Sequence, residues 1–145
     1  MSDLETRMMQ WYWRQVGGTL IVEFPIVSRS PGGSPQVVDG VIIRRGKWQI
    51  SHWSEVALEG QDVIVVHALA ERLNMALMGH VLYSARLAER LRPRSVYSVA
   101  LVAQDDRVLR HLLEVERNMK VVVCPDLRSQ EVAAGGVLLD EDAGE

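Results

Sequence analysis

An aspartate and a histidine interrupt two of the most apolar segments of the chain. Asp39 lies within residues 37–43 (Val-Val-Asp-Gly-Val-Ile-Ile), and His67 lies within residues 62–69 (Asp-Val-Ile-Val-Val-His-Ala-Leu). A carboxylate among apolar side chains is unfavourable unless it has a hydrogen-bond partner or a metal ion. Asp39 is therefore a candidate functional residue. The alternative is an aspartate exposed at the rim of a sheet.

A second histidine could join these two residues in a metal site. His80 lies on the helix predicted after the second segment, on the helical stripe expected to face the sheet, so it could meet His67. One carboxylate and two imidazoles resemble the ligand set of a transition metal, so Asp39, His67 and His80 are candidate metal ligands. The alternative is a pair of core histidines that hydrogen-bond to the backbone or to Asp39.

The pattern of apolar residues and of turn residues predicts one α/β domain. Strands are expected at residues 19–27, 36–43, 63–68, 95–103 and 120–124, and helices at residues 3–16, 71–91 and 105–116. Residues 63–68 are apolar on both faces, which is typical of a central strand covered on both sides. The sequence between 47 and 59 is ambiguous. We expect a single domain at residues 1–125, followed by an acidic, flexible tail at residues 126–145.

The order of these elements and a few short motifs resemble the PD-(D/E)XK nuclease superfamily, which includes restriction endonucleases and Holliday-junction resolvases. The resemblance implies an α/β fold with a restriction-endonuclease-like αβββαβ core, a mixed central sheet flanked by helices. Glu5 matches the glutamate of the family's first helix, and Asp39 matches the aspartate of its second strand. His67 stands where the family has a carboxylate, Leu69 where it has a lysine, and His80 where it often has a glutamine.

These departures predict a catalytically degenerate site. The family's chemistry uses carboxylates to hold Mg²⁺, which prefers oxygen ligands, and a lysine to stabilise the charge on the phosphate. Leu69 carries no charge, and an imidazole such as that of His67 is a poor Mg²⁺ ligand. We therefore expect no catalysis and no cofactor. The alternative is a divergent active nuclease that uses Mg²⁺ or Mn²⁺. Its site would consist of Glu5, Glu23, Asp39 and His67, and Lys47 would take the place of the missing lysine.

The charged residues favour local rather than global attraction to nucleic acid. The formal net charge of the 145 residues is −3, and the 16 basic residues are fourteen arginines with only Lys47 and Lys120. Arginine suits the bidentate recognition of phosphate, although a GC-rich genome gives the same bias. A candidate rim for weak binding of DNA or RNA consists of Arg44, Arg45, Arg90, Arg92 and Arg94.

The remaining composition bears on partners and compartment. The four tryptophans, Trp11, Trp13, Trp48 and Trp53, predict surfaces for a homodimer or a partner protein, and ordinary packing is the alternative. A third hypothesis is thus a structural or regulatory subunit with no role in nucleic-acid binding. The single Cys124 fits a reducing compartment, and no apolar run approaches the ~20 residues of a membrane span. We expect a cytoplasmic protein with no membrane partner.

Overall fold

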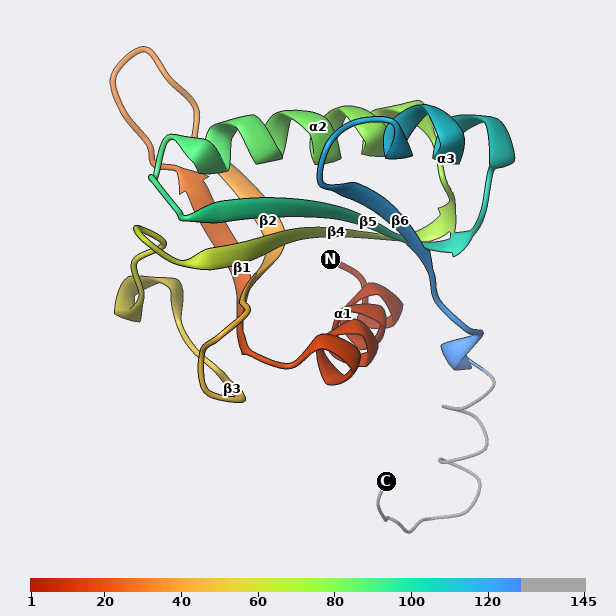
Figure 1. The fold of residues 1–145 in the computed structure, drawn as a ribbon, viewed down its shortest axis with the longest axis horizontal. Helices are drawn as coiled ribbons and strands as arrows, with labels where there is room; N and C mark the ends of the chain where they lie inside the picture. The colour runs from red at the N-terminus through yellow and green to blue at the C-terminus, as the bar shows by residue number, and fades with distance from the viewer. Residues whose placement is uncertain (129–145) are drawn as a thin grey trace, which may run out of the picture.

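A six-stranded mixed sheet forms the middle layer of the molecule (Figure 1). The structure is a computed structural model, and it describes residues 1–128. Helix α1 (Asp3–Val16) covers one face of the sheet, and helices α2 (Met75–Glu89) and α3 (Arg107–Glu114) cover the other. The strands are β1 (Thr19–Val27), β2 (Gln36–Ile43), β3 (Gln49–Ile50), β4 (Asp62–Arg72), β5 (Ser95–Gln104) and β6 (Met119–Val123). The prediction of an α/β fold with a mixed sheet flanked by helices is confirmed.

The sheet joins an antiparallel half to a parallel half. Its order is β3-β1-β2-β4-β5-β6. Strands β1, β2 and β4 pair antiparallel, whereas β4, β5 and β6 pair parallel, with α2 and α3 as the crossovers. Strand β4 lies between β2 and β5, and residues 63–68 are all buried. The prediction that this apolar segment is a central strand is therefore confirmed.

Helix α1 begins and ends at residues suited to those positions. The Ser2 hydroxyl accepts the Glu5 N–H at 3.1 Å, and the Glu5 side chain accepts the Ser2 N–H at 3.0 Å, which forms a capping box. Gly17 ends the helix with a φ of 76°, a conformation that glycine adopts without strain. Met8, Met9 and Trp13 form the buried side of the helix, so α1 packs on the sheet through one face.

The predicted helix at residues 71–91 is wrong at both ends, most clearly at its N-terminus. Strand β4 continues through Arg72, which pairs with Gln104 of β5. Asn74 then caps α2, because its side-chain oxygen accepts the Leu77 N–H at 2.9 Å. The hydrogen-bond ladder to β5 thus outweighs the helical propensity of the Glu-Arg-Leu sequence.

The packed domain extends beyond the boundary expected at residue 125. Leu127 falls in the predicted tail, yet it is buried against the α1 side of the core. The rest of that predicted tail, residues 129–145, lies outside the described residues. The ambiguous sequence between 47 and 59 contains β3 and a short 3₁₀ helix, η1 (Trp53–Glu55). None of the helices in residues 1–128 combines the length and the apolar character that a bilayer span requires.

Candidate functional site

Asp39 lies where strands β2 and β4 separate. The last residue pair between these strands is Gly40 with Val66. Beyond that pair, Asp39 Oδ2 accepts the backbone N–H of Ala68 at 2.9 Å. The carboxylate therefore takes the place of a carbonyl that β2 would have presented had the ladder continued.

Glu5 repeats this contact two residues further along β4. Its Oε2 accepts the backbone N–H of Ala70 at 3.0 Å, while its Oε1 holds the Ser2 N–H. One side chain thus caps α1 and ties that helix to the sheet. The two carboxylates expected at the site do come together, and both satisfy main-chain donors on the open edge of β4.

Burial disfavours the charged form of Asp39. Desolvation raises the pKa of Asp39 above its ordinary value, and the negative charge of Glu5 adds to that rise. The hydrogen bond from the Ala68 N–H acts in the opposite direction because it stabilises the carboxylate. The site therefore resists the accumulation of negative charge.

His67 is held by the α2 side of the core. The residue is 6% exposed, and its Nε2 lies 2.8 Å from the Ser84 Oγ of α2. Burial, with a smaller contribution from His80, lowers the pKa of His67 to about 4, so the imidazole is neutral at physiological pH. The centres of the two imidazole rings are 5.8 Å apart, so the predicted proximity of His67 and His80 is confirmed. The prediction that His80 lies on the buried stripe of its helix is wrong, because the residue is exposed to solvent.

The candidate metal ligands do not form a metal site in this arrangement. Within residues 1–128, no group of three or more His, Cys, Asp or Glu side chains is placed to hold a metal ion. Asp39 Oδ2 is occupied by Ala68, and His67 Nε2 is occupied by Ser84. In this arrangement one possible ligand atom of Asp39 and one of His67 thus already take part in hydrogen bonds within the fold.

Neither Leu69 nor Lys47 places a positive charge beside Asp39 and Glu5. Leu69 is half-buried and packs against the cluster between the sheet, α2 and α3. The main-chain oxygen of Lys47 accepts a hydrogen bond from Thr19, which pairs with Ile43. Ile43 lies four positions after Asp39 in β2, which is roughly 13 Å along the strand. Lys47 is therefore anchored away from the carboxylates.

Glu23 has an unusual backbone conformation beside the site. It lies in β1 between the residues that pair with Val38 and Gly40, which places it across from Asp39. Its φ is +53°, a region that costs a residue other than glycine about 1–3 kcal/mol. Its side chain is exposed to solvent. Backbone strain therefore adjoins Asp39, a feature that the sequence did not indicate.

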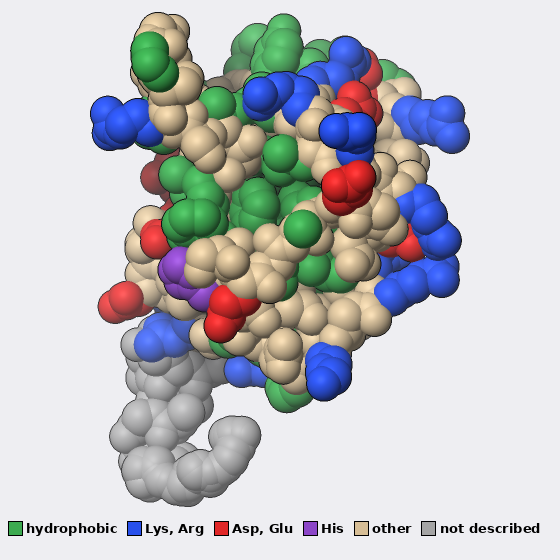
Figure 2. Space-filling view, turned by 90° about the vertical axis from the view of Figure 1, so that its left-hand side faces the viewer, with side chains coloured by type: hydrophobic (Ala, Val, Ile, Leu, Met, Phe, Trp, Pro, Cys, Tyr) green, Lys and Arg blue, Asp and Glu red, His purple; other side chains and the backbone are tan. Residues whose placement is uncertain are grey.

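The arginines of the predicted rim lie at the other end of the sheet, where β4 begins. From Asp39 to Arg44 the chain advances five residues, or roughly 17 Å. Figure 2 faces this end of the molecule, and Lys and Arg side chains, with Asp and Glu side chains among them, lie around an area of hydrophobic side chains. The predicted binding rim and the predicted catalytic residues are therefore separate sites.

Asp62 organises this end of the molecule, a role that was not expected from the sequence. Its carboxylate accepts hydrogen bonds from Arg94 at 3.1 and 2.7 Å and from Ser95 at 2.6 Å, and Arg45 lies 3.2 Å away. The bonds from Arg94 and then Ser95 hold the pKa of Asp62 below its ordinary value. An aspartate that starts an apolar strand was the available signal for this role.

The five rim arginines thus fall into two groups. Arg45 and Arg94 pair with Asp62, and Arg44 lies over the Tyr97 ring, with 5.1 Å from its guanidinium carbon to the ring centre. Arg90 and Arg92 have no side-chain partner among the described residues. These last two are the most available for phosphate.

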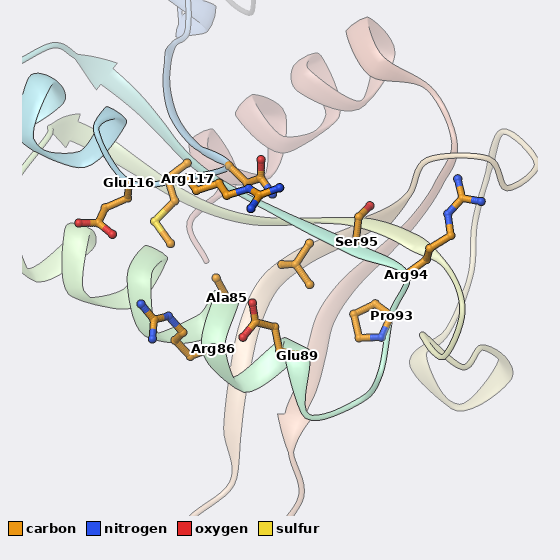
Figure 3. A pocket seen from close by; sticks show the side chains of 11 residues that line it. Ala85, Arg86, Glu89, Pro93, Arg94, Ser95, Glu116 and Arg117 are labelled. Carbon is orange, nitrogen blue, oxygen red and sulfur yellow. The ribbon is translucent and has the colours of Figure 1, made fainter.

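A groove of about 580 Å³ adjoins Arg94, between the second half of α2 and the turn before β6 (Figure 3). Its lining includes three guanidinium groups and two carboxylates, from Arg86, Arg94, Arg117, Glu89 and Glu116. The carboxylates offset much of the positive charge. The groove is therefore a poor site for a polyanion.

The tryptophans divide between core and surface. Trp13 is buried, Trp11 is half-buried, and both belong to the α1 side of the core. Trp48 is 62% exposed and stacks on Trp13 with ring centres 4.5 Å apart, and Trp53 is 45% exposed. The exposed tryptophans therefore belong to the segment from Trp48 to Trp53.

Comparison of the chain with protein-family models, with curated proteins and with solved structures found no match.

Proposed function

We propose that this protein is a catalytically inert relative of the PD-(D/E)XK nucleases that binds nucleic acid without cutting it. The observation that carries the proposal is the use of the two carboxylates. Asp39 and Glu5 each accept a backbone N–H from β4, at Ala68 and Ala70. With Leu69 in the cation position, these carboxylates stabilise the fold at the place where the family holds its metal.

Local charge supports the binding part of the proposal. Five of the 19 acidic residues and none of the 16 basic residues lie after Arg128, so residues 1–128 carry a formal net charge of +2. Arg90 and Arg92 are exposed and lie between the end of α2 and the start of β5. Binding through a few phosphates is weak and salt-dependent, with a Kd of about 10⁻⁴–10⁻⁶ M at physiological salt.

Cleavage assays test the inert site. In the presence of Mg²⁺ or Mn²⁺, the protein should cut neither duplex nor single-stranded DNA faster than the Asp39→Ala variant. Metal-dependent cleavage that disappears in this variant would contradict the proposal and support the active-nuclease alternative.

Fluorescence anisotropy with a labelled DNA duplex tests the binding. The Arg90→Gln/Arg92→Gln variant should bind less tightly, and the slope of log K against log salt should fall by about 0.9 for each phosphate that the variant no longer neutralises. The effect should be equal across sequences, because phosphate contacts carry no sequence information. An Arg107→Gln/Arg128→Gln variant removes the same charge elsewhere and is the control. An equal decrease in affinity in both variants would assign binding to net charge alone.

A partner protein is the second candidate ligand, and the exposed aromatic segment favours it. Trp48, Ile50 and Trp53 are 62%, 53% and 45% exposed, and large aromatic side chains are frequent hot spots of protein interfaces. A homodimer formed through this surface should dissociate on dilution and in a Trp53→Ser variant. Sedimentation that is independent of both would remove self-association from consideration.

A further inference from the structure

Another concavity lies on the α1 side of the sheet, and it shares Asn118 with the groove of Figure 3. It measures about 410 Å³ and lies between the end of α1 and strands β4, β5 and β6. Tyr12 comes from α1, Tyr97 from β5 and Lys120 from β6, while Arg44 follows β2. The volume falls within the range of small-molecule sites.

The floor and the walls of this pocket differ in chemistry. Ile64 and Val99 belong to the core cluster on this face of the sheet and provide an apolar floor. Tyr97 is 39% exposed, so part of its ring remains open to a ligand. Among the residues that the structure describes, the lining includes Arg44 and Lys120 and no carboxylate, although Tyr97 and Lys120 also line an adjoining hollow that Glu114 and Glu116 border. The lining of this pocket is therefore more positive than that of the groove beside Arg94.

The positive charge is held beside the aromatic rings. The Arg44 guanidinium lies over the Tyr97 ring, which fixes the charge at the aromatic wall of the pocket. Burial raises the pKa of Tyr12, and Arg44 opposes that rise, so the phenol and the guanidinium lie within electrostatic reach. A phosphate attached to a ring stacked on this wall would come within reach of the guanidinium.

We propose that this pocket binds one nucleotide, with its base against the part of the Tyr97 ring that Arg44 leaves open and its phosphate at Arg44 and Lys120. The inference rests on the proposed function and deepens it, because it assigns single-stranded nucleic acid or a free nucleotide as the ligand. A base in a duplex is stacked on its neighbours and cannot enter the pocket. Duplex binding at the rim and nucleotide binding in the pocket are therefore separable.

Two variants with matched controls test the pocket. Tyr97→Leu removes the stacking ring but keeps an apolar side chain, and Tyr83→Leu makes the same change at a tyrosine that is 66% exposed on α2. Lys120→Gln removes one pocket cation, and Lys47→Gln is its control. Binding of a labelled single-stranded oligonucleotide is measured by anisotropy, binding of AMP by calorimetry, and binding of a labelled duplex serves as the reference.

Tyr97→Leu should weaken single-strand binding by about five- to one-hundred-fold and leave duplex binding unchanged, whereas Tyr83→Leu should change neither. Lys120→Gln should weaken single-strand binding more than Lys47→Gln does. AMP binding that is abolished in Tyr97→Leu, with no oligonucleotide binding, would identify a free nucleotide as the ligand. If Tyr97→Leu changes neither single-strand binding nor AMP binding, the pocket is not the nucleotide site, and the proposed binding at Arg90 and Arg92 is unaffected by that result. Absence of all binding, duplex included, would overturn both proposals.

Discussion

At the scale of single residues, a carboxylate that could bind a metal ion can instead accept hydrogen bonds from the unpaired N–H groups of a strand edge. Asp39 and Glu5 accept the N–H groups of Ala68 and Ala70, which β2 leaves without carbonyl partners. A buried N–H without an acceptor is destabilising by about 1–3 kcal/mol. The same two residue types thus serve the fold at a position where the family resemblance implies chemistry.

Substitutions at Asp39 separate its hydrogen bond from its charge. Asp39→Ala leaves the Ala68 N–H without a partner and should lower the free energy of unfolding by about 1–3 kcal/mol. Asp39→Asn keeps an oxygen acceptor and removes a charge that burial disfavours, so it should lower that free energy less. Urea denaturation measures both, and equal decreases would show that the charge itself is stabilising.

The pH dependence of the Asp39→Asn variant has a definite sign. The pKa of Asp39 is raised in the fold, so the folded protein holds this proton more tightly than the unfolded chain does. Its contribution to stability is therefore lost as pH rises through the folded pKa. The stability of Asp39→Asn relative to the wild type should therefore increase as pH rises from the ordinary pKa of an aspartate through the raised pKa of Asp39, and it should level off above that. A constant or decreasing difference would contradict the raised pKa.

His67 should destabilise the fold in acid. Burial lowers its pKa to about 4, whereas the unfolded chain titrates near 6.5. The unfolded chain thus binds more protons between these values, and stability falls as pH decreases from 6.5 to about 4, by roughly 3 kcal/mol. NMR should show an imidazole that does not titrate above about pH 5 and whose signals disappear in His67→Gln. Titration near 6.5 would refute the burial argument.

At the scale of elements, the sequence was informative where its apolar pattern was regular. Strands β1 and β2 and helix α1 have the predicted bounds, because their alternation or their caps mark both ends. Strand β3 spans only two residues and exists through its pairing with β1, which no local pattern encodes. The extension of β4 through Arg72 likewise depends on β5. The hydrogen bonds from Ala68 and Ala70 were unpredictable for the same reason, since they depend on where β2 leaves β4.

Helix α1 packs on the sheet with the Met9 side chain directly against Gly40. A Cβ at this position would meet the sulfur and the terminal methyl of Met9 at 2.8 and 2.9 Å, and Met9 is fully buried. Gly40→Ala should therefore lower the free energy of unfolding by about 1–3 kcal/mol through overpacking. Gly79→Ala is the control, because Gly79 lies within α2 and a Cβ there meets nothing within 4 Å. That change should raise stability by up to about 1 kcal/mol.

Chemical denaturation of the two alanine variants measures this difference in packing. Opposite signs are expected, since the same added methyl group enters a filled interface in one case and open space in the other. Two destabilised variants would show that helix α2 tolerates no change at Gly79. Two neutral variants would show that Met9 moves aside at Gly40 at no cost in stability, and that α1 packs less tightly than its buried side chains indicate.

At the scale of the whole molecule, charge is divided along the sequence. Residues 1–128 carry a formal net charge of +2, whereas the full chain carries −3 because five carboxylates and no basic residue follow Arg128. The net charge of the whole chain therefore understates the positive charge of residues 1–128. If Arg90, Arg92 and the pocket beside Tyr97 bind nucleic acid as proposed, negative charge elsewhere on the same chain should oppose that binding.

Shortening the chain after Arg128 should raise its affinity for a labelled oligonucleotide up to about tenfold at low salt, since electrostatic attraction is then little screened. The gain should disappear near 1 M salt, where the screening length is about 3 Å. A full-length control replaces Glu131, Asp140, Glu141, Asp142 and Glu145 by their amides, which removes the charge and keeps the length. If charge is the cause, anisotropy should give the same affinity for the control and the shortened chain. A gain in the shortened chain alone would assign the effect to the bulk of these residues, and no gain in either would show that the basic sites act independently of them.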